Sequence, residues 1–155
     1  MQPEQHARHV ILRSAVAIGL AGIALIHLLD STSKFNETPY VGWLYVALMV
    51  GSLFTAGLVA TRGTSGQFAL AAGLALGAIA GYVLSRTTGL PSSSGDIGNW
   101  KEPLGMASLF VEGCVVAASA GGMTLLRTHR STERRVARDT PADLPLSYEQ
   151  VGVRR

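Results

Sequence analysis

Four apolar stretches, separated by short polar segments, constrain this chain more than any other feature. They cover residues 10–29, 41–60, 68–84 and 104–126. A bilayer core is about 30 Å thick and a helix rises about 1.5 Å per residue, so about 20 apolar residues cross it. Each stretch must be helical, because backbone N–H and C=O groups find no water in lipid. The sequence therefore predicts an all-α membrane protein, a four-helix transmembrane bundle.

The composition supports this class and excludes others. Charged residues make up only 15% of the 155 residues, whereas soluble globular proteins have about 25%. This low share argues against a soluble enzyme and a disordered chain. A single cysteine, Cys114, excludes an internal disulfide, and we expect it to be a small buried residue of the fourth span. We divide the chain into a transmembrane domain, residues 1–126, and a basic, partly disordered cytoplasmic tail, residues 127–155.

The distribution of basic residues predicts the orientation. With both termini in the cytoplasm, the cytoplasmic segments hold Arg8, Arg13, Arg62, Arg127, Arg130, Arg134, Arg135, Arg138, Arg154 and Arg155. The outer segments, predicted as loops over residues 30–40 and 85–103, then hold only Lys34, Arg86 and Lys101. This asymmetry follows the positive-inside rule and predicts an N-in, C-in protein. Residues 128–138 are expected to continue the fourth helix, with their arginines at anionic lipid rather than nucleic acid.

Small residues recur at helical spacing and suggest where the helices pack. The third span carries Gly73, Gly77 and Gly81 on one face, and the fourth carries Gly113 and Gly121. Membrane helices gain little by burying apolar surface against each other, so small residues that permit close approach mark their contacts. We interpret these glycines as contacts inside the bundle, and a homodimer contact is the alternative.

Glu112 is the most informative polar residue, because it lies inside the fourth apolar stretch. An ionised carboxylate there is costly unless it is paired, hydrated or protonated. It is therefore either a protonated, hydrogen-bonded structural group or a group that handles a ligand, a proton or an ion. His27 and Asp30, three residues apart near the end of the first span, share a helix face. Their structural interpretation is a hydrogen bond between helices or at the headgroups.

Two further residues complete a candidate site. Arg86 closes the third span, and Glu37 precedes the second. Arg86 is suited to bind a carboxylate or a lipid phosphate, and Glu37 to stabilise a helix N-terminus. Together with His27, Asp30 and Glu112 they come from all four spans, and all lie in the outer half of the bundle. This convergence predicts a polar ligand-binding pocket that opens outward, covered by the loop over residues 87–103.

Several known kinds of site do not fit the sequence. Only one histidine, His27, lies in a span, which argues against a bis-histidine haem. A metal site is not expected, because no second histidine accompanies it. A Gly-x-Ser-x-Gly elbow and a phosphate-binding loop are absent from the sequence. We therefore expect no cofactor and no enzymatic activity.

One resemblance adds to this interpretation. The segments His27-Leu28-Leu29-Asp30, Lys34-Phe35-Asn36-Glu37, Ser85-Arg86-Thr87-Thr88-Gly89-Leu90-Pro91 and Glu102-Pro103-Leu104-Gly105 carry it. The chain resembles small actinobacterial four-helix membrane proteins with a Ser-Arg-Thr-x-Gly-Leu-Pro segment after the third helix. The resemblance covers about residues 11–126 and implies four spans in a bacterial plasma membrane. It implies no chemistry.

The sequence leaves three functions open. The first is a non-enzymatic accessory or binding subunit that holds a small ligand in the outer pocket. The second is a purely structural subunit that docks on other membrane proteins through its glycine faces. The third is a small proton-coupled transporter in which Glu112 carries the proton.

Overall fold

The structure is a computed structural model that describes residues 3–139, and these residues form four long helices. They are α1 (Pro3–Glu37), α2 (Pro39–Thr61), α3 (Ser65–Thr87) and α4 (Pro103–Asp139). The described residues contain no strand beyond an isolated bridge between Leu90 and Ser93. All four helices are long and apolar enough to cross a membrane, so the predicted helical membrane fold is confirmed at this level.

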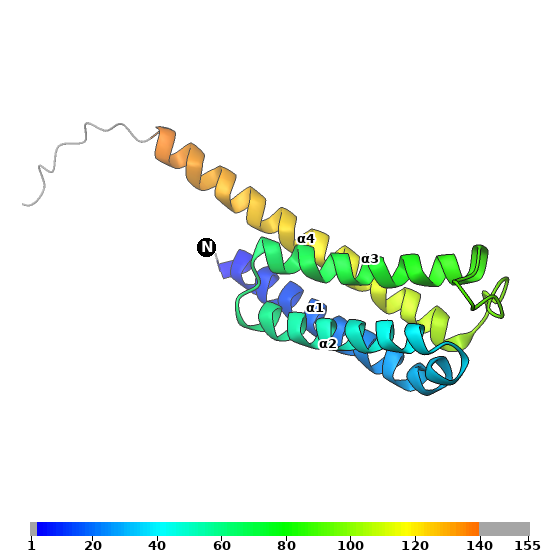
Figure 1. Cartoon of the computed structure of the whole chain (residues 1–155). Helices are drawn as coiled ribbons and strands as arrows, with labels where there is room; N and C mark the ends of the chain where they lie inside the picture. The colour runs from blue at the N-terminus through cyan, green and yellow to red at the C-terminus, as the bar shows by residue number, and fades with distance from the viewer. Residues whose placement is uncertain (1–2, 140–155) are drawn as a thin grey trace, which may run out of the picture.

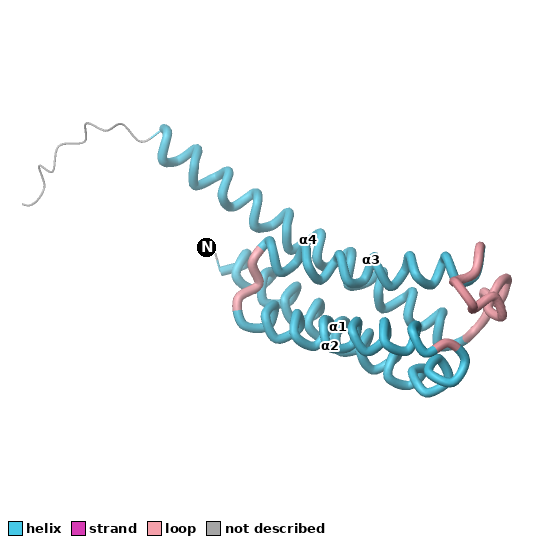
Figure 2. Tube along the Cα trace, viewed as in Figure 1, coloured by secondary structure: helices cyan, strands magenta, loops and turns pink. Residues whose placement is uncertain are grey.

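The helices run up and down in one bundle (Figures 1 and 2). α1 packs extensively against α2 and also against α4, and α4 packs against α3. α2 and α3 meet much more sparsely, although only a short turn joins them. The bundle therefore has one loosely closed side, between α2 and α3.

The junction between α1 and α2 differs from the prediction. The outer loop expected over residues 30–40 is helical as far as Glu37, and Thr38 alone separates the two helices. Ion pairing between Lys34 and Glu37 and a hydrogen bond from Ser33 to Glu37 hold the last turns of α1. Pro39 lies at the start of α2, a position that suits a residue without a backbone N–H.

The turn between α2 and α3 is held by groups of α1. The side chain of Arg13 donates hydrogen bonds to the carbonyls of Val59 and Ala60, at the end of α2. Gly63 follows with a φ of +61°, a conformation that glycine adopts freely, and a Cβ there would collide with the Arg13 side chain. Thr64 then caps α3 in a reciprocal pair with Gln67.

Apolar packing concentrates near this turn. The buried core joins Val16, Leu20 and Ile23 of α1 to Val59, Phe68, Ala71, Ala75 and Val115 of the other helices. Two glycines let large side chains approach: a Cβ at Gly19 would collide with Val115, and one at Gly122 would lie 2.6 Å from the Phe68 ring. The half of the bundle near the α2–α3 turn is thus tightly packed.

Most of the glycines predicted to form helix contacts inside the bundle do not form them. A Cβ added at Gly73, Gly77, Gly81 or Gly113 would meet no atom within 4 Å, so these glycines do not bring helices together inside the bundle. Gly121 is closer to the expectation, since its Cβ would lie 3.4 Å from Leu12. The physical reason is that Gly73, Gly77 and Gly81 face a cavity, described below, and not a neighbouring helix.

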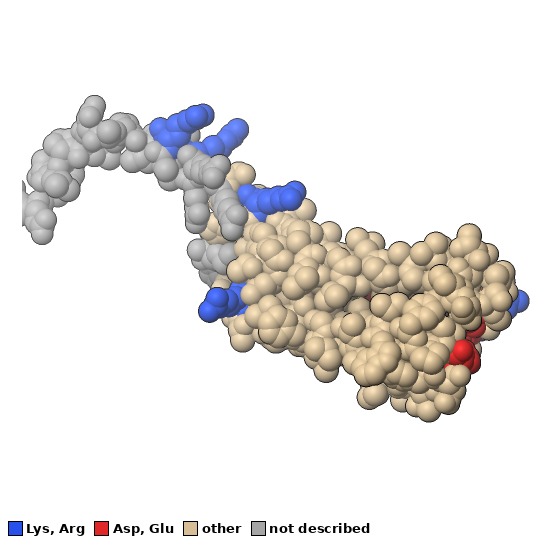
Figure 3. All heavy atoms as spheres, in the orientation of Figure 1, with Lys and Arg blue, Asp and Glu red and all other residues tan. Residues whose placement is uncertain are grey.

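The surface of the bundle seen in Figure 3 carries almost no charged side chains between its two ends. Large side chains such as Ile18, Phe54 and Phe110 are two thirds exposed or more, as suits contact with lipid. Cys114 is also exposed, which corrects the expectation that it is buried. It faces outward because the inward face of this part of α4 is taken by Glu112 and Val115.

α4 continues beyond the other helices (Figure 1). It runs unbroken to Asp139, so the expected helical continuation over residues 128–138 is confirmed. Exposed arginines Arg127, Arg135 and Arg138 lie on this extension. The remainder of the predicted tail, residues 140–155, lies outside the described residues.

Candidate functional site

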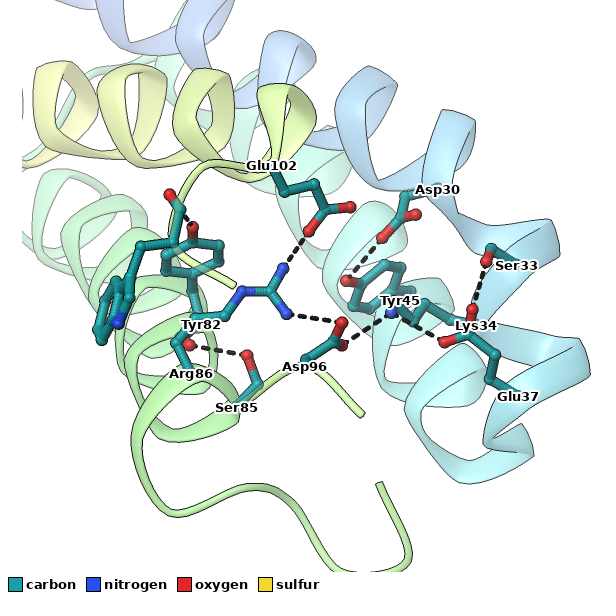
Figure 4. A network of polar contacts seen from close by, with 11 residues as sticks. Asp30, Ser33, Lys34, Glu37, Tyr45, Tyr82, Ser85, Arg86, Asp96 and Glu102 are labelled. Carbon is teal, nitrogen blue, oxygen red and sulfur yellow. Dashed lines mark hydrogen bonds and ion pairs between the residues drawn. The ribbon is translucent and has the colours of Figure 1, made fainter. Parts of the chain in front are cut away.

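The site is built at the end of the bundle that contains the α1–α2 junction, residues 88–102 and the start of α4. We call this the acidic end. Four ionisable side chains from different segments form a chain of ion pairs there (Figure 4). Lys34 Nζ of α1 lies 2.9 Å from Asp96 Oδ2, and Arg86 Nη1 of α3 lies 2.8 Å from Asp96 Oδ1. Arg86 Nη2 pairs in addition with Glu102.

Both cations of this chain are buried. Arg86 is 4% exposed and Lys34 is 7% exposed, whereas the Asp96 and Glu102 side chains are about a quarter exposed. The Arg86 guanidinium also lies 4.8 Å from the centre of the Tyr82 ring, one turn earlier on α3. Each cation is shared between two carboxylates, although Arg86 Nε and Nη1 form no hydrogen bond among the described residues.

Asp96 ties the loop over residues 88–102 to the helices. Burial opposes its ionisation, but the hydrogen bond from Lys34 and the positive charges of Lys34 and Arg86 together lower the pKa of Asp96 below its ordinary value. The backbone adds a second connection, since the N–H of Gly98 donates to the carbonyl of Arg86 at 2.9 Å. The loop is thus held over the end of the bundle by charge and by the main chain.

Beneath this loop is a cavity of about 460 Å³ that touches all four helices. Its polar part is lined by the ion pairs and by Asp30, Tyr45 and Tyr82. Its apolar part runs along Leu44 and Leu48 of α2 and along Leu74 and the three glycines Gly73, Gly77 and Gly81 of α3. The cavity is therefore amphipathic, with charge at one end and hydrocarbon along its length.

The cavity opens sideways as well. Leu44 is 59% exposed, and Ala47, Gly73 and Gly77 are also exposed, although all four line the cavity. They lie within the candidate spans of α2 and α3, on the loosely packed side of the bundle. An apolar molecule in the bilayer would reach the cavity through this opening.

Glu112 lies in the cavity wall about 13 Å along α4 from its first residue, Pro103. The residue is 1% exposed, and its Oε1 accepts a hydrogen bond of 2.6 Å from Ser108 Oγ. Its Oε2 is buried with no hydrogen-bond partner among the residues that the structure describes. A buried carboxyl oxygen that lacks a partner, on a residue that lines a cavity, is a candidate to bind a guest molecule or water.

His27 and Asp30 line the cavity on the α1 side. One His27 ring nitrogen, Nδ1, is 2.9 Å from the Ile23 carbonyl, and the ring packs edge-on against Tyr45 at 4.7 Å. The hydroxyl of Tyr45 donates to Asp30 Oδ2 at 3.1 Å. Within residues 3–139 no ion pair reaches Asp30, so its negative charge is not balanced by a neighbouring cation.

Four of the five predicted site residues therefore line one cavity: His27, Asp30, Arg86 and Glu112. Glu37 does not line it. Its carboxylate is half exposed and pairs with Lys34, and through Lys34 it connects to the ion-pair chain. The structure thus places Glu37 on the outside of the site, where it supports the end of α1.

Sequence reasoning missed Lys34, Asp96, Glu102, Tyr45 and Tyr82 as members of the site. Lys34, Asp96 and Glu102 fall in the predicted outer segments, where charge is ordinarily solvated. Tyr45 and Tyr82 lie near the ends of their apolar stretches, where aromatic rings are ordinarily expected at the membrane interface. One signal in the sequence could have indicated the two carboxylates. A buried Arg86 needs an anionic partner, and Asp96 and Glu102 are the carboxylates nearest to it along the chain.

Comparison with known proteins adds no assignment. No protein-family model, no curated protein and no solved structure matches the chain. Within the described residues, no group of three or more His, Cys, Asp or Glu side chains is placed to hold a metal ion. The function is therefore argued from the cavity itself.

Proposed function

We propose that this protein is a non-enzymatic membrane protein that binds a small amphipathic molecule in the cavity at the acidic end. The ion-pair chain fixes the polar end of the cavity and holds the loop over it. The side opening between α2 and α3 admits the apolar part of the molecule from the bilayer. The protein acts in this proposal as a binding or accessory subunit.

The observation that carries the proposal is the state of Glu112. An unsatisfied buried carboxyl oxygen costs about 1–3 kcal/mol, more if it is charged, and a purely structural residue would be expected to have its partners in the fold. Glu112 Oε2 has none in the described chain, and the residue lines the cavity. A bound molecule, or water in the empty state, supplies the missing partner.

Native mass spectrometry in lipid nanodiscs tests the proposal. The wild-type protein is expected to carry a retained small molecule or lipid, and Gly77→Leu is expected to reduce its occupancy at least about fivefold, because the new side chain projects into the cavity. Gly113→Leu is the matched control: Gly113 is a helical glycine whose Cβ also meets no atom within 4 Å, but it does not line the cavity. Equal occupancy in all three proteins would overturn the proposal.

We further propose that the acidic end faces away from the cytoplasm and that both termini are cytoplasmic, in a bacterial plasma membrane. The basic residues support this, because most of the Lys and Arg side chains visible in Figure 3 lie at the opposite end and on the α4 extension. Arg8 near the start of α1, Arg62 in the α2–α3 turn and Arg127 belong to the segments of that end. These arginines would lie near anionic lipid headgroups.

Single cysteines test the orientation in intact cells. In a Cys114→Ala background, Ser94→Cys places a thiol in the exposed loop at the acidic end, and Arg62→Cys places one in the turn between α2 and α3. A membrane-impermeant maleimide is expected to label the first in intact cells and the second only after lysis. The reverse pattern would show that the orientation is inverted.

A further inference from the structure

The cavity carries a negative charge that the fold does not compensate. Apart from Glu112, three carboxylates, those of Asp30, Asp96 and Glu102, line it against the two cations Lys34 and Arg86. Both cations are buried and each is shared between two carboxylates. Arg86 Nε and Nη1 form no hydrogen bond among the described residues, but Nη1 already lies 2.8 Å from Asp96. Asp30 has no ion-pair partner in the described chain, so a cation would meet a negative charge there that is not yet paired.

From this balance we infer that the ligand is a lipophilic cation, a single positive charge carried on an apolar body. This inference rests on the proposed binding function and names the class of ligand for the same cavity. The geometry points to a cationic group held between Asp30 and Glu112, with the apolar body along the glycine face of α3.

Asp30 supplies the first interaction. It has no ion-pair partner in the described chain, and it accepts a hydrogen bond from the hydroxyl of Tyr45. Figure 4 shows Asp30 and Glu102 turned toward the space between Tyr45 and the Arg86 guanidinium. A cation in this space would lie beside the carboxylate of Asp30.

Glu112 supplies the second interaction, deeper in the membrane. Its Oε2 is buried and lacks a partner, and Ser108 holds its Oε1 at 2.6 Å and so fixes the carboxyl group. A carboxylate at this depth is costly alone but is stabilised by an adjacent cation. The carboxyl group therefore favours a positively charged occupant over a neutral or anionic one.

The walls determine the apolar part of the ligand. Leu44 and Leu48 form one side, and Gly73 and Gly77, which carry no side chain, leave the opposite side broad. The glycines thus make room for a bulky ring or a branched body, and the exposed edge at Leu44 and Gly73 lets it enter from lipid. A hydrophilic cation would gain nothing from these walls.

Two probes of the same shape and opposite charge test the inference. Tetraphenylphosphonium and tetraphenylborate are added to the full chain in phosphatidylcholine nanodiscs, and binding to empty nanodiscs is subtracted. The wild-type protein is expected to bind the cation at least about tenfold more tightly than the anion. Tighter binding of the anion, or equal binding of both, would overturn the inference.

Variants locate the charge. Asp30→Asn and Glu112→Gln are each expected to weaken phosphonium binding at least about tenfold, because each removes an opposite charge from a partly dehydrated site. The control, Glu4→Gln, removes one carboxylate of the same kind at the exposed start of α1 and should bind as the wild type does. Because Asp30 is only partly buried, its variant remains informative should Glu112→Gln fail to fold.

The two proposals fail separately. If neither probe binds but a retained molecule is still lost in Gly77→Leu, the cavity binds a ligand of another class and the cation inference is wrong. If phosphonium binds and is unaffected by Asp30→Asn, Glu112→Gln and Gly77→Leu alike, it binds elsewhere and the cation inference is wrong. The proposed function is then decided by whether Gly77→Leu loses the retained molecule. Selective binding that all three variants weaken supports both.

Discussion

Replacing Arg86 by methionine should destabilise the protein strongly. Methionine keeps much of the side-chain volume but removes the positive charge that faces Asp96 at 2.8 Å and also pairs with Glu102. Removing one partner of a buried ion pair typically costs about 3–5 kcal/mol, because the other charge stays buried and unpaired. The two carboxylates are about a quarter exposed, so water relieves part of this cost. We expect a loss of about 2–4 kcal/mol.

The assay is unfolding in mixed micelles by titration with sodium dodecyl sulfate, followed by helical circular dichroism. Lys101→Met removes a neighbouring, exposed positive charge and is expected to change the unfolding free energy by less than about 0.5 kcal/mol. A double variant, Arg86→Met with Glu102→Gln, should be more stable than the sum of the single effects implies, by about 1–3 kcal/mol. A loss below about 0.5 kcal/mol for Arg86→Met, or additivity in this cycle, would refute the reasoning.

Three further predictions concern other parts of the structure. Arg13→Met removes the hydrogen bonds to the last carbonyls of α2 and should cost about 1–3 kcal/mol in the same titration, whereas exposed Arg8→Met should cost almost nothing. Gly122→Leu places a side chain against the buried Phe68 ring and should lower the unfolding free energy by about 1–3 kcal/mol or more. Gly113→Leu, on the exposed face of α4, should be tolerated. A larger loss for Gly113→Leu than for Gly122→Leu would contradict the packing of Gly122 against Phe68. The pKa of Asp96 is lowered, so the ionised carboxylate contributes fully to stability above its ordinary pKa of 3.8, and this contribution is lost as the pH falls toward the lowered pKa. Asp96→Asn should therefore make the unfolding free energy less sensitive to acid. An unchanged dependence of the unfolding free energy on pH would exclude a stabilising role of the Asp96 carboxylate.

The class of fold was predictable because hydrophobic length is a local property of the sequence. Four apolar stretches gave four helices, and the prolines Pro39 and Pro103 marked the starts of two of them. The end of α1 was not predictable in the same way. Its last turns, around Ser33, Lys34 and Glu37, are polar, and only their mutual contacts reveal that they continue the helix.

The site was predictable in part for a similar reason. Charges inside apolar stretches, such as Glu112, are rare and stand out. Asp96 and Glu102 lie in a polar segment, where nothing in the sequence separates a buried carboxylate from a solvated one. The glycines of α3 show the reverse difficulty, because the same small-residue pattern serves a close helix contact or a cavity wall. Only the position of the neighbouring helix distinguishes these two uses.

The single-residue junction at Thr38 also bears on how the molecule moves. α1 and α2 are packed along their length and joined without slack, so they must tilt as one rigid hairpin. α3 and α4 are bridged by the fifteen residues from Thr88 to Glu102, which are anchored to both hairpins by the carboxylate of Asp96. Movement of the two hairpins relative to each other would therefore be greatest along the sparsely packed contact between α2 and α3. The ion pairs of Asp96 would restrain this movement at the acidic end.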